Sequence, residues 1–207
     1  SSRTAKGTPS VQLLPIPREE QITSIVSVEA FDNERYLLML TKAGFIKRTP
    51  LSAFSKIRSN GLIAINLEEG DALTWVRLST EGDSVLIGSR RGMTIHFRLD
   101  ISELRPLGRT ARGVKSMNLK DGDKLVSMDV LTSDLVDQLA KIDNENDEND
   151  ENDENLESNS SNGPWVLVAS AFGLGKRVPV TQFRLQKRAG MGSVSYTHLR
   201  AHETEAD

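Results

Sequence analysis

The chain has 207 residues, of which 37% are hydrophobic and none is cysteine. The absence of cysteine excludes a disulfide scaffold, a cysteine nucleophile and a thiolate metal site. No apolar run approaches the ~18 residues that a membrane-spanning helix needs, and the first residues lack the apolar stretch of a signal peptide. We therefore expect a soluble intracellular protein without membrane contact, and the missing initial Met favours a fragment of a longer chain.

The formal net charge of −3 depends on a single segment. Residues 143–157 hold nine acidic residues and no basic one, and without them 26 lysines and arginines face 20 acidic residues. The rest of the chain is therefore basic. A basic body favours a polyanionic partner, although charge alone does not name it.

The sequence repeats with a period of about 50 residues. Short basic stretches that contain a glycine mark the repeats: RTAKG at 3–7, RSNG at 58–61, RTARG at 109–113 and KRAG at 187–190. An apolar strand is expected after each of the first three, at 10–14, 62–67 and 114–119. The expected repeats are 2–56, 57–107 and 108–186, with a fourth that begins at 187.

Within each repeat the same elements follow in the same order. A Gly-Asp turn followed by a strand is expected at 68–78 and at 120–131, and the matching strand of the first repeat is expected at 22–28. Two apolar runs joined by a glycine turn come next, at 36–54, 84–104 and 165–183. Only 52–57, 101–104 and 133–142 could form short helical turns. Four strands per period of this length predict a propeller-like array of blades, and three repeats predict an incomplete arc.

Two segments fall outside this pattern. We expect residues 141–163 to be a disordered acidic insertion in the third repeat, because they are too charged to pack. Acidic residues at Asp143–Glu154 have partial EF-hand spacing, but Glu148 stands where that loop needs glycine, so no calcium site is expected. Residues 193–207 are expected to be an artefactual tail, because SYTHLRAHET at 195–204 resembles a translated adapter sequence, so His198 and His202 are not expected to bind metal.

The repeat motifs themselves resemble the C-terminal domain of the DNA gyrase A family. The resemblance spans residues 2–192 apart from the acidic tract, and it is strongest to cyanobacterial versions and then to plant or algal organelle versions. It depends on these strings, in this order: GTPSVQLLPI, IRSNGLIAINLEEGDAL, GRTARGVKSMNLKDGDKLVSMDVL and GKRVPVTQFRLQKRAGMG. The resemblance implies an all-β β-pinwheel, in which four-stranded antiparallel blades exchange strands, with about three blades present as an incomplete arc.

The resemblance also implies a function. Such a domain binds and wraps double-stranded DNA for an ATP-dependent type IIA topoisomerase that introduces negative supercoils, in an A2B2 complex with gyrase B and a second copy of gyrase A. The catalytic tyrosine, ATP and Mg²⁺ act elsewhere in that enzyme, so this chain is expected to be non-catalytic and without a cofactor. The expected location is the bacterial cytoplasm, or alternatively a plastid or mitochondrion.

Two alternatives stay open on sequence alone. The basic box that marks the first blade of gyrase is missing, so the C-terminal domain of the corresponding topoisomerase IV protein stays an alternative. A propeller-like protein-interaction scaffold with an incidental basic rim is the alternative from another class. No set of catalytic groups emerges, and His96 lies between apolar residues of an expected strand, where a structural role is favoured.

Paired basic residues recur at the repeat period, and stacked repeats would align them along one rim. Such a row of cations can follow DNA phosphates and release their counterions, although it can also be a solvated sheet edge. The candidate phosphate contacts are the pairs Lys47, Arg48, Arg90, Arg91, Lys176 and Arg177, followed by the repeat-start cluster of Arg58, Arg109, Arg112 and Arg188.

The acidic tract generates a first prediction. Because a solvated Asn-Asp-Glu repeat needs no partner, deleting residues 143–157 is expected to leave the affinity for duplex DNA unchanged at about 50 mM salt. The measurement is a titration of the intact and shortened chains with one duplex. Tighter binding with a steeper salt dependence would instead show that the tract competes with DNA for the basic rim.

Overall fold

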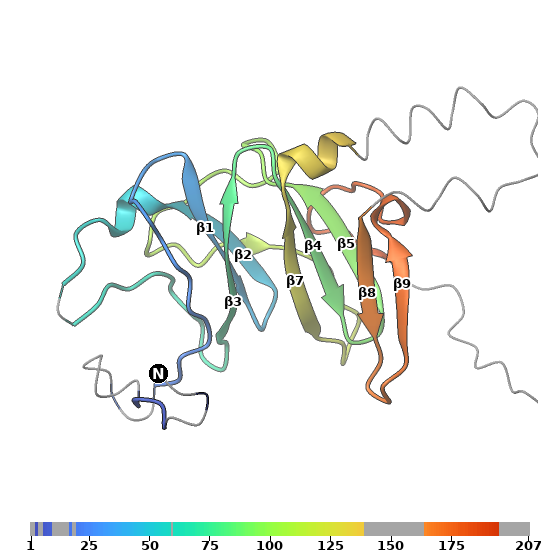
Figure 1. Ribbon diagram of the computed structural model, residues 1–207, viewed down its shortest axis with the longest axis horizontal. Helices are drawn as coiled ribbons and strands as arrows, with labels where there is room; N and C mark the ends of the chain where they lie inside the picture. Colours follow the sequence, from blue (N-terminus) through green and yellow to red (C-terminus); the bar gives the residue numbers. More distant parts are fainter. Residues whose placement is uncertain are drawn as a thin grey trace, which may run out of the picture.

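The computed structural model describes residues 3, 6–9, 17, 20–58, 60–138 and 164–194. Two four-stranded antiparallel sheets and a two-stranded hairpin follow one another across the molecule (Figure 1). This arrangement confirms the all-β class and the antiparallel blades. Within the described part of the chain, no helix is long and apolar enough to cross a membrane. The acidic insertion at 141–163 and residues 195–207 lie outside the described residues. Residues 193 and 194, which were expected to belong to the tail, instead form a strand of the second sheet.

The first sheet has the strand order β3-β1-β2-β6 and the second has the order β10-β5-β4-β7. The strands of the first sheet are β1 (Arg35–Thr41), β2 (Phe45–Pro50), β3 (Leu73–Thr80) and β6 (Val114–Lys115). The strands of the second are β4 (Ser84–Ser89), β5 (Met93–Arg98), β7 (Leu125–Leu131) and β10 (Ser193–Val194). The third hairpin consists of β8 (Trp165–Ala169) and β9 (Gly175–Pro179). The helical turns are η1 (Leu51–Phe54), η3 (Val180–Gln182) and residues 133–138.

Each four-stranded sheet combines strands from three repeats. The hairpin β1–β2 belongs to the first repeat, its neighbour β3 to the second and β6 to the third. In the second sheet, the hairpin β4–β5 belongs to the second repeat, its neighbour β7 to the third and β10 to the fourth. A repeat and a blade are therefore different segments of the chain, as strand exchange requires.

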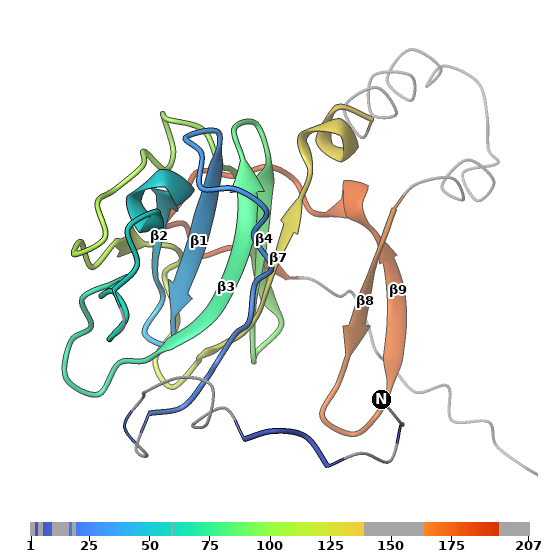
Figure 2. The same ribbon diagram turned by 60° about the vertical axis from the view of Figure 1, so that its left-hand side comes forward.

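Strand exchange also explains where two expected strands do not form. Residues 22–28 and 62–67 are not strands, although Figure 2 shows the first of these segments beside β3 and Ser24 Oγ lies 3.5 Å from the Val76 carbonyl oxygen. Their equivalents β3 and β6 pair with hairpins of earlier repeats. By the same pattern, the segments 22–28 and 62–67 would each pair with a hairpin that lies earlier in the chain than β1. The described residues contain no such hairpin.

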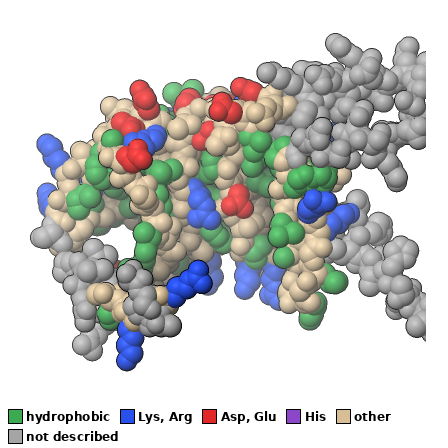
Figure 3. Space-filling model, in the orientation of Figure 1, with side chains coloured by type: hydrophobic (Ala, Val, Ile, Leu, Met, Phe, Trp, Pro, Cys, Tyr) green, Lys and Arg blue, Asp and Glu red, His purple; other side chains and the backbone are tan. Residues whose placement is uncertain are grey.

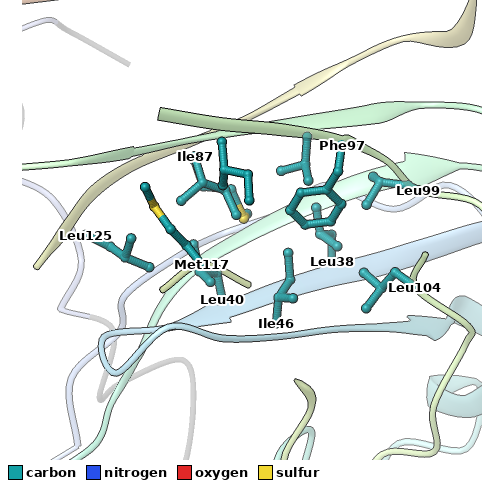
Figure 4. Packing of buried hydrophobic residues seen from close by; sticks show 12 residues of the cluster. Leu38, Leu40, Ile46, Ile87, Phe97, Leu99, Leu104, Met117 and Leu125 are labelled. Carbon is teal, nitrogen blue, oxygen red and sulfur yellow. The ribbon is translucent and has the colours of Figure 1, made fainter. Parts of the chain in front are cut away.

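The main core lies between the first two sheets. Leu38 and Leu40 of β1 point toward Ile87 and Phe97 of the second sheet, and all four side chains are fully buried (Figure 4). Alternating positions of an antiparallel strand face opposite sides, which places these residues on one face. Each contributes roughly 1.5–3 kcal/mol by its burial.

One row of large side chains fills the interface between the first and second sheets. At the interface between the second sheet and the third hairpin, smaller side chains occupy the equivalent positions. Neighbouring positions on β3, β1 and β2 hold Trp75, Leu40 and Ile46. The equivalent positions on β7, β4 and β5 hold Ser127, Gly88 and Thr94. Because small and polar residues replace large apolar ones, a hollow of about 660 Å³ lies between the second sheet and the third hairpin.

A small apolar cluster makes contact across this second interface. Leu86 of β4 packs with Val178 and Phe183, and Val166 and Val168 of β8 lie against them. The third hairpin is consequently held by fewer buried side chains than the two complete sheets.

Two glycines allow the chain to cross closely over a strand of an earlier repeat. Gly113 has a φ of +105°, and a Cβ at this position would lie 2.6 Å from the Ile46 carbonyl oxygen. Gly192, with a φ of +74°, has the same relation to the Thr94 carbonyl oxygen. Ile46 and Thr94 are equivalent positions, so Gly192 rather than Gly190 is the structural counterpart of Gly113.

Gly113 provides a stability prediction with an internal control. Replacing Gly113 by Ala should lower the free energy of unfolding by at least about 2 kcal/mol, because a left-handed φ and a backbone clash combine. Replacing Gly108 by Ala should change it by less than about 1 kcal/mol, since nothing lies within 4 Å of that Cβ. Urea denaturation measures both, and equal effects would contradict the close crossing.

Candidate nucleic-acid interface

Exposed basic side chains gather at the end of the sheets where the hairpins turn. Lys42 lies in the β1–β2 turn, and Arg90 and Arg91 occupy the β4–β5 turn. Lys120 and Lys124 flank the turn that leads into β7, and all five side chains are exposed. We call these five residues the turn-end cations.

Two aspartates hold neighbouring turns together at this end. The Asp71 carboxylate accepts a hydrogen bond from the Ala43 backbone N–H at 2.8 Å, and Asp123 accepts one from the Arg91 N–H at 3.1 Å. Both aspartates belong to the Gly-Asp turns recognised in the sequence. In both four-stranded sheets, the Gly-Asp turn before β3 or β7 therefore holds the backbone of the adjacent hairpin turn, which carries Lys42 or Arg90 and Arg91.

The two ends of the sheets differ in charge. Basic side chains lie along the lower edge of Figure 3, where the hairpins turn, and most acidic side chains of this view lie along the upper edge. A polyanion approaching the lower edge would meet a favourable field, which increases its rate of association. The asymmetry favours the turn end over the opposite end as the polyanion surface.

The expectation of a phosphate contact is wrong for Lys47. Its side chain is fully buried, and its ammonium lies 2.6–3.0 Å from the carbonyl oxygens of Ala64, Gly108, Arg109 and Ala111. Burial, followed by the charge of Arg109, lowers the pKa of Lys47 to about 8. The linkers of two later repeats cover this side chain, so no phosphate can reach it.

Arg48 is also buried, and a phosphate contact is excluded for the same reason. Its guanidinium donates to the Leu104 carbonyl oxygen through Nε, and through Nη1 to the Leu99 carbonyl oxygen at 2.6 Å and to Glu81 at 2.7 Å. The group also lies over the Tyr36 ring, 4.7 Å from its centre. Arg48 thus joins the first sheet to the turn at the end of the second hairpin.

Lys176 and Arg177 are exposed on β9, although they occupy the positions equivalent to Lys47 and Arg48. Arg177 lies over the Trp165 ring at 4.9 Å, as Arg48 lies over Tyr36. By register, Lys176 and Arg177 correspond to residues that make internal contacts. Because both side chains are exposed, a phosphate could reach them.

The repeat-start cluster lies partly at the surface. Arg58 is exposed, and exposed Arg112 is ion-paired with Glu68 and lies 4.2 Å from the centre of the Phe45 ring. Half-buried Arg109 approaches the Ile63 carbonyl oxygen at 3.5 Å.

Arg188, the fourth member of the cluster, is held by other parts of the protein. Its guanidinium donates to the carbonyl oxygens of Glu103 and Lys115, at 2.9 and 2.6 Å. Of the four residues, Arg58 and Arg112 are the more accessible to a ligand.

His96 is a structural residue, as its place in the sequence suggests. It is buried on β5 at the position equivalent to Arg48, with Nε2 2.8 Å from Ser84 Oγ and Nδ1 2.7 Å from the Phe183 carbonyl oxygen. Burial is the main cause that lowers the pKa of His96 below its ordinary value. Among the described residues, no group of three His, Cys, Asp or Glu side chains could hold a metal ion.

Three of the turn-end cations are not among the residues expected from the sequence: Lys42, Lys120 and Lys124. They are single lysines next to glycine or Gly-Asp turns, whereas the sequence pattern emphasises paired basic residues. Their position in a hairpin turn is the signal that could have found them, because loop tips lie at the surface.

His96 generates a pH prediction. Because its pKa is lower in the folded than in the unfolded chain, its contribution to stability is present above pH 6.5 and is lost as the pH falls below that value. The melting temperature should therefore fall between pH 7.5 and pH 5 by more in the unaltered chain than in His96→Gln, which cannot titrate. Parallel curves for the two chains would contradict the buried neutral imidazole.

Comparisons with known proteins agree with this geometry. The family model described as "DNA gyrase C-terminal domain, beta-propeller" matches residues 35–80, 83–132 and 164–199. The DNA gyrase A protein of Synechocystis sp. is 56% identical over 93% of this chain and 23% of its own length. The chloroplastic/mitochondrial gyrase A protein of Nicotiana benthamiana is 41% identical over 94% of this chain and 20% of its own length. The chain thus spans less than a quarter of these curated relatives.

Two solved structures share the fold. The C-terminal domain of a DNA topoisomerase IV has a TM-score of 0.71 at 28% identity, covering 95% of this chain and 52% of that one. A DNA gyrase A C-terminal domain has a TM-score of 0.66 at 23% identity, covering 91% of this chain and 53% of that one. Since the family model matches well over half of the sequence, the chain belongs to the family of DNA gyrase A C-terminal β-propeller domains.

Proposed function

We propose that this chain binds and wraps double-stranded DNA as a module of a gyrase-type, type IIA topoisomerase. The observation that carries the proposal is the row of exposed cations at the turn end of two successive sheets, in a chain of this family. Cations spaced along a curved array can neutralise successive phosphates and release their counterions. DNA that follows such a surface bends with it.

The proposed contacts are mostly phosphate contacts. Arg90 and Arg91 are common to the sequence expectation and the turn end, and Lys42, Lys120 and Lys124 join them. Arg58, Arg112 and, less exposed, Arg109 are proposed as a second group, with Lys176 and Arg177 as accessible cations of the third hairpin. Such contacts position a protein on DNA without reading its bases, so we expect little sequence preference.

Within the whole protein we propose the activity that the family resemblance implies. With gyrase B and a second copy of gyrase A, the enzyme would use ATP and Mg²⁺ bound elsewhere to introduce negative supercoils, and this chain would supply DNA wrapping without chemistry of its own. The bacterial cytoplasm is the proposed location, with an organelle as the alternative because plant organellar gyrase A proteins are among the relatives.

A second candidate is the C-terminal domain of the corresponding topoisomerase IV protein, which the shared fold at a TM-score of 0.71 favours. Both candidates bind DNA, so binding alone does not separate them. Supercoiling by the full protein does, because only the gyrase-type activity adds negative supercoils. A protein-interaction scaffold would bind no duplex even at low salt.

The turn end can be tested with a matched pair of variants on one hairpin. Replacing Arg90 and Arg91 by Gln should weaken duplex binding equally for two unrelated sequences and lower the log–log salt slope by about 0.9 for each lost contact. Replacing Arg98 by Gln at the opposite end of β5 should leave the slope unchanged. The measurement is fluorescence anisotropy at several salt concentrations.

Two results would move the DNA surface away from the turn end. One is a loss that depends on the DNA sequence, and the other is an equal effect of the Arg98 variant. Failure of the unaltered chain to bind either duplex at about 50 mM salt would contradict the proposed function itself.

A further inference from the structure

Lys47 has an unusual environment for a lysine. The ammonium group is fully buried, and four backbone carbonyl oxygens surround it at 2.6–3.0 Å, from Ala64, Gly108, Arg109 and Ala111. None of the ion pairs among the described residues involves Lys47. The partial charges of the four oxygens replace the water that the ammonium loses, which is the requirement for burying a charge.

The four carbonyls come from two different linkers. Ala64 belongs to the segment that follows Gly61, and the other three belong to the loop at 108–113, which begins the third repeat. This loop is otherwise fixed at its ends: the Leu107 N–H donates to the Arg48 carbonyl oxygen at 2.8 Å, and Gly113 packs on Ile46. The contact with Lys47 fixes its middle.

The same loop carries two of the proposed DNA contacts. Arg109 supplies one of the four carbonyl oxygens directly, and Arg112 follows Ala111, which supplies another. Displacement of the loop middle would therefore move both guanidinium groups. We infer that Lys47 is a positioning residue, which touches no DNA itself and holds the loop at 108–113 so that Arg109 and Arg112 face the phosphate backbone.

The inference depends on the proposed function for its DNA part only. The structural part, that Lys47 fixes the loop, can be measured without DNA. The two parts can therefore fail separately.

The side chains around Lys47 allow its titration to be distinguished from that of other groups. The segment at 62–65 has no titratable side chain, Met39 lies opposite on β1, and the charged side chains of the loop are those of Arg109 and Arg112. Burial lowers the pKa of Lys47 from 10.5 to about 8. Between these values the unfolded chain binds one more proton than the folded chain, so stability must rise with pH.

The loop is tested by hydrogen–deuterium exchange of the Leu107 and Ala111 amides at one pH. In Lys47→Met, both amides should exchange at least tenfold faster, while amides of β4 and β5 stay protected. Lys47→Ile is the second variant, because Ile95 fills the equivalent position on β5. Lys115→Met, which removes an exposed lysine nearby, is the matched control and should leave this exchange unchanged.

The DNA part is tested by a double-mutant cycle. Lys47→Met should weaken duplex binding in the unaltered chain and have no further effect in a chain that already carries Arg109→Gln and Arg112→Gln. Equal losses in both backgrounds would overturn the positioning role. If the unaltered chain binds no duplex, the proposed function fails, and the amide exchange still decides whether Lys47 holds the loop.

The buried state of Lys47 is tested by stability between pH 8 and pH 10. The folding equilibrium constant of the unaltered chain should rise about tenfold per pH unit relative to Lys47→Met. An unchanged ratio would show that the four carbonyl oxygens fully offset the burial of the charge, and the amide exchange would then decide whether Lys47 holds the loop. Unfolding of both Lys47 variants would overturn the inference, because Lys47 would then hold the whole sheet and not the loop.

Discussion

In the described part of the chain, neither four-stranded sheet is built from a single repeat, and most other features follow from this constraint. A hairpin such as β1–β2 has two edges with unpaired backbone groups, and unpaired edges are costly when buried and prone to wrong pairing when exposed. The next repeat covers one edge with β3, and the repeat after it covers the other with β6. Each linker must therefore cross an earlier sheet, which explains the glycine at position 113 where the two backbones nearly touch.

The crossings bury polar groups, and the protein satisfies them in the same way twice. Arg48 on β2 and His96 on β5 occupy equivalent positions, and each donates to the carbonyl at the end of the following hairpin, Leu104 or Phe183. Each also contacts the side chain at the start of the neighbouring strand, Tyr36 or Ser84. A cation in one sheet and a neutral imidazole in the other thus perform one architectural role.

Local signals predict the hairpins well. The apolar alternation around the glycines at 44 and 92 is contained within about twenty residues, and so is the Gly-Asp turn before the outer strand. Pairing between repeats is a contact across distant parts of the chain, and the pattern of one strand does not state which hairpin it will join. The segments at 22–28 and 62–67 have the sequence pattern of strands, which carries no information about a pairing partner, and they do not form strands.

The buried pair on β2 shows a second limit of sequence reading. Lysine and arginine are almost always exposed, so the sequence alone places Lys47 and Arg48 at the surface with Arg90 and Arg91. The burial of Lys47 depends on linkers that lie 17 to 64 residues away in the chain. The pairs look alike in the sequence, but one lies in the middle of a covered strand and the other at a hairpin tip.

The hollow beside the second sheet has a mechanical consequence. Close-packed interfaces resist both shear and separation, whereas an interface with small side chains on one face has few contacts to lose. Trp75, Leu40 and Ile46 fill the interface between the first two sheets, whereas Ser127, Gly88 and Thr94 leave a hollow before the third hairpin, where less packing opposes movement. An array built this way can change its curvature at one interface, and so adapt its radius to a stiff polymer without disturbing the core of either complete sheet.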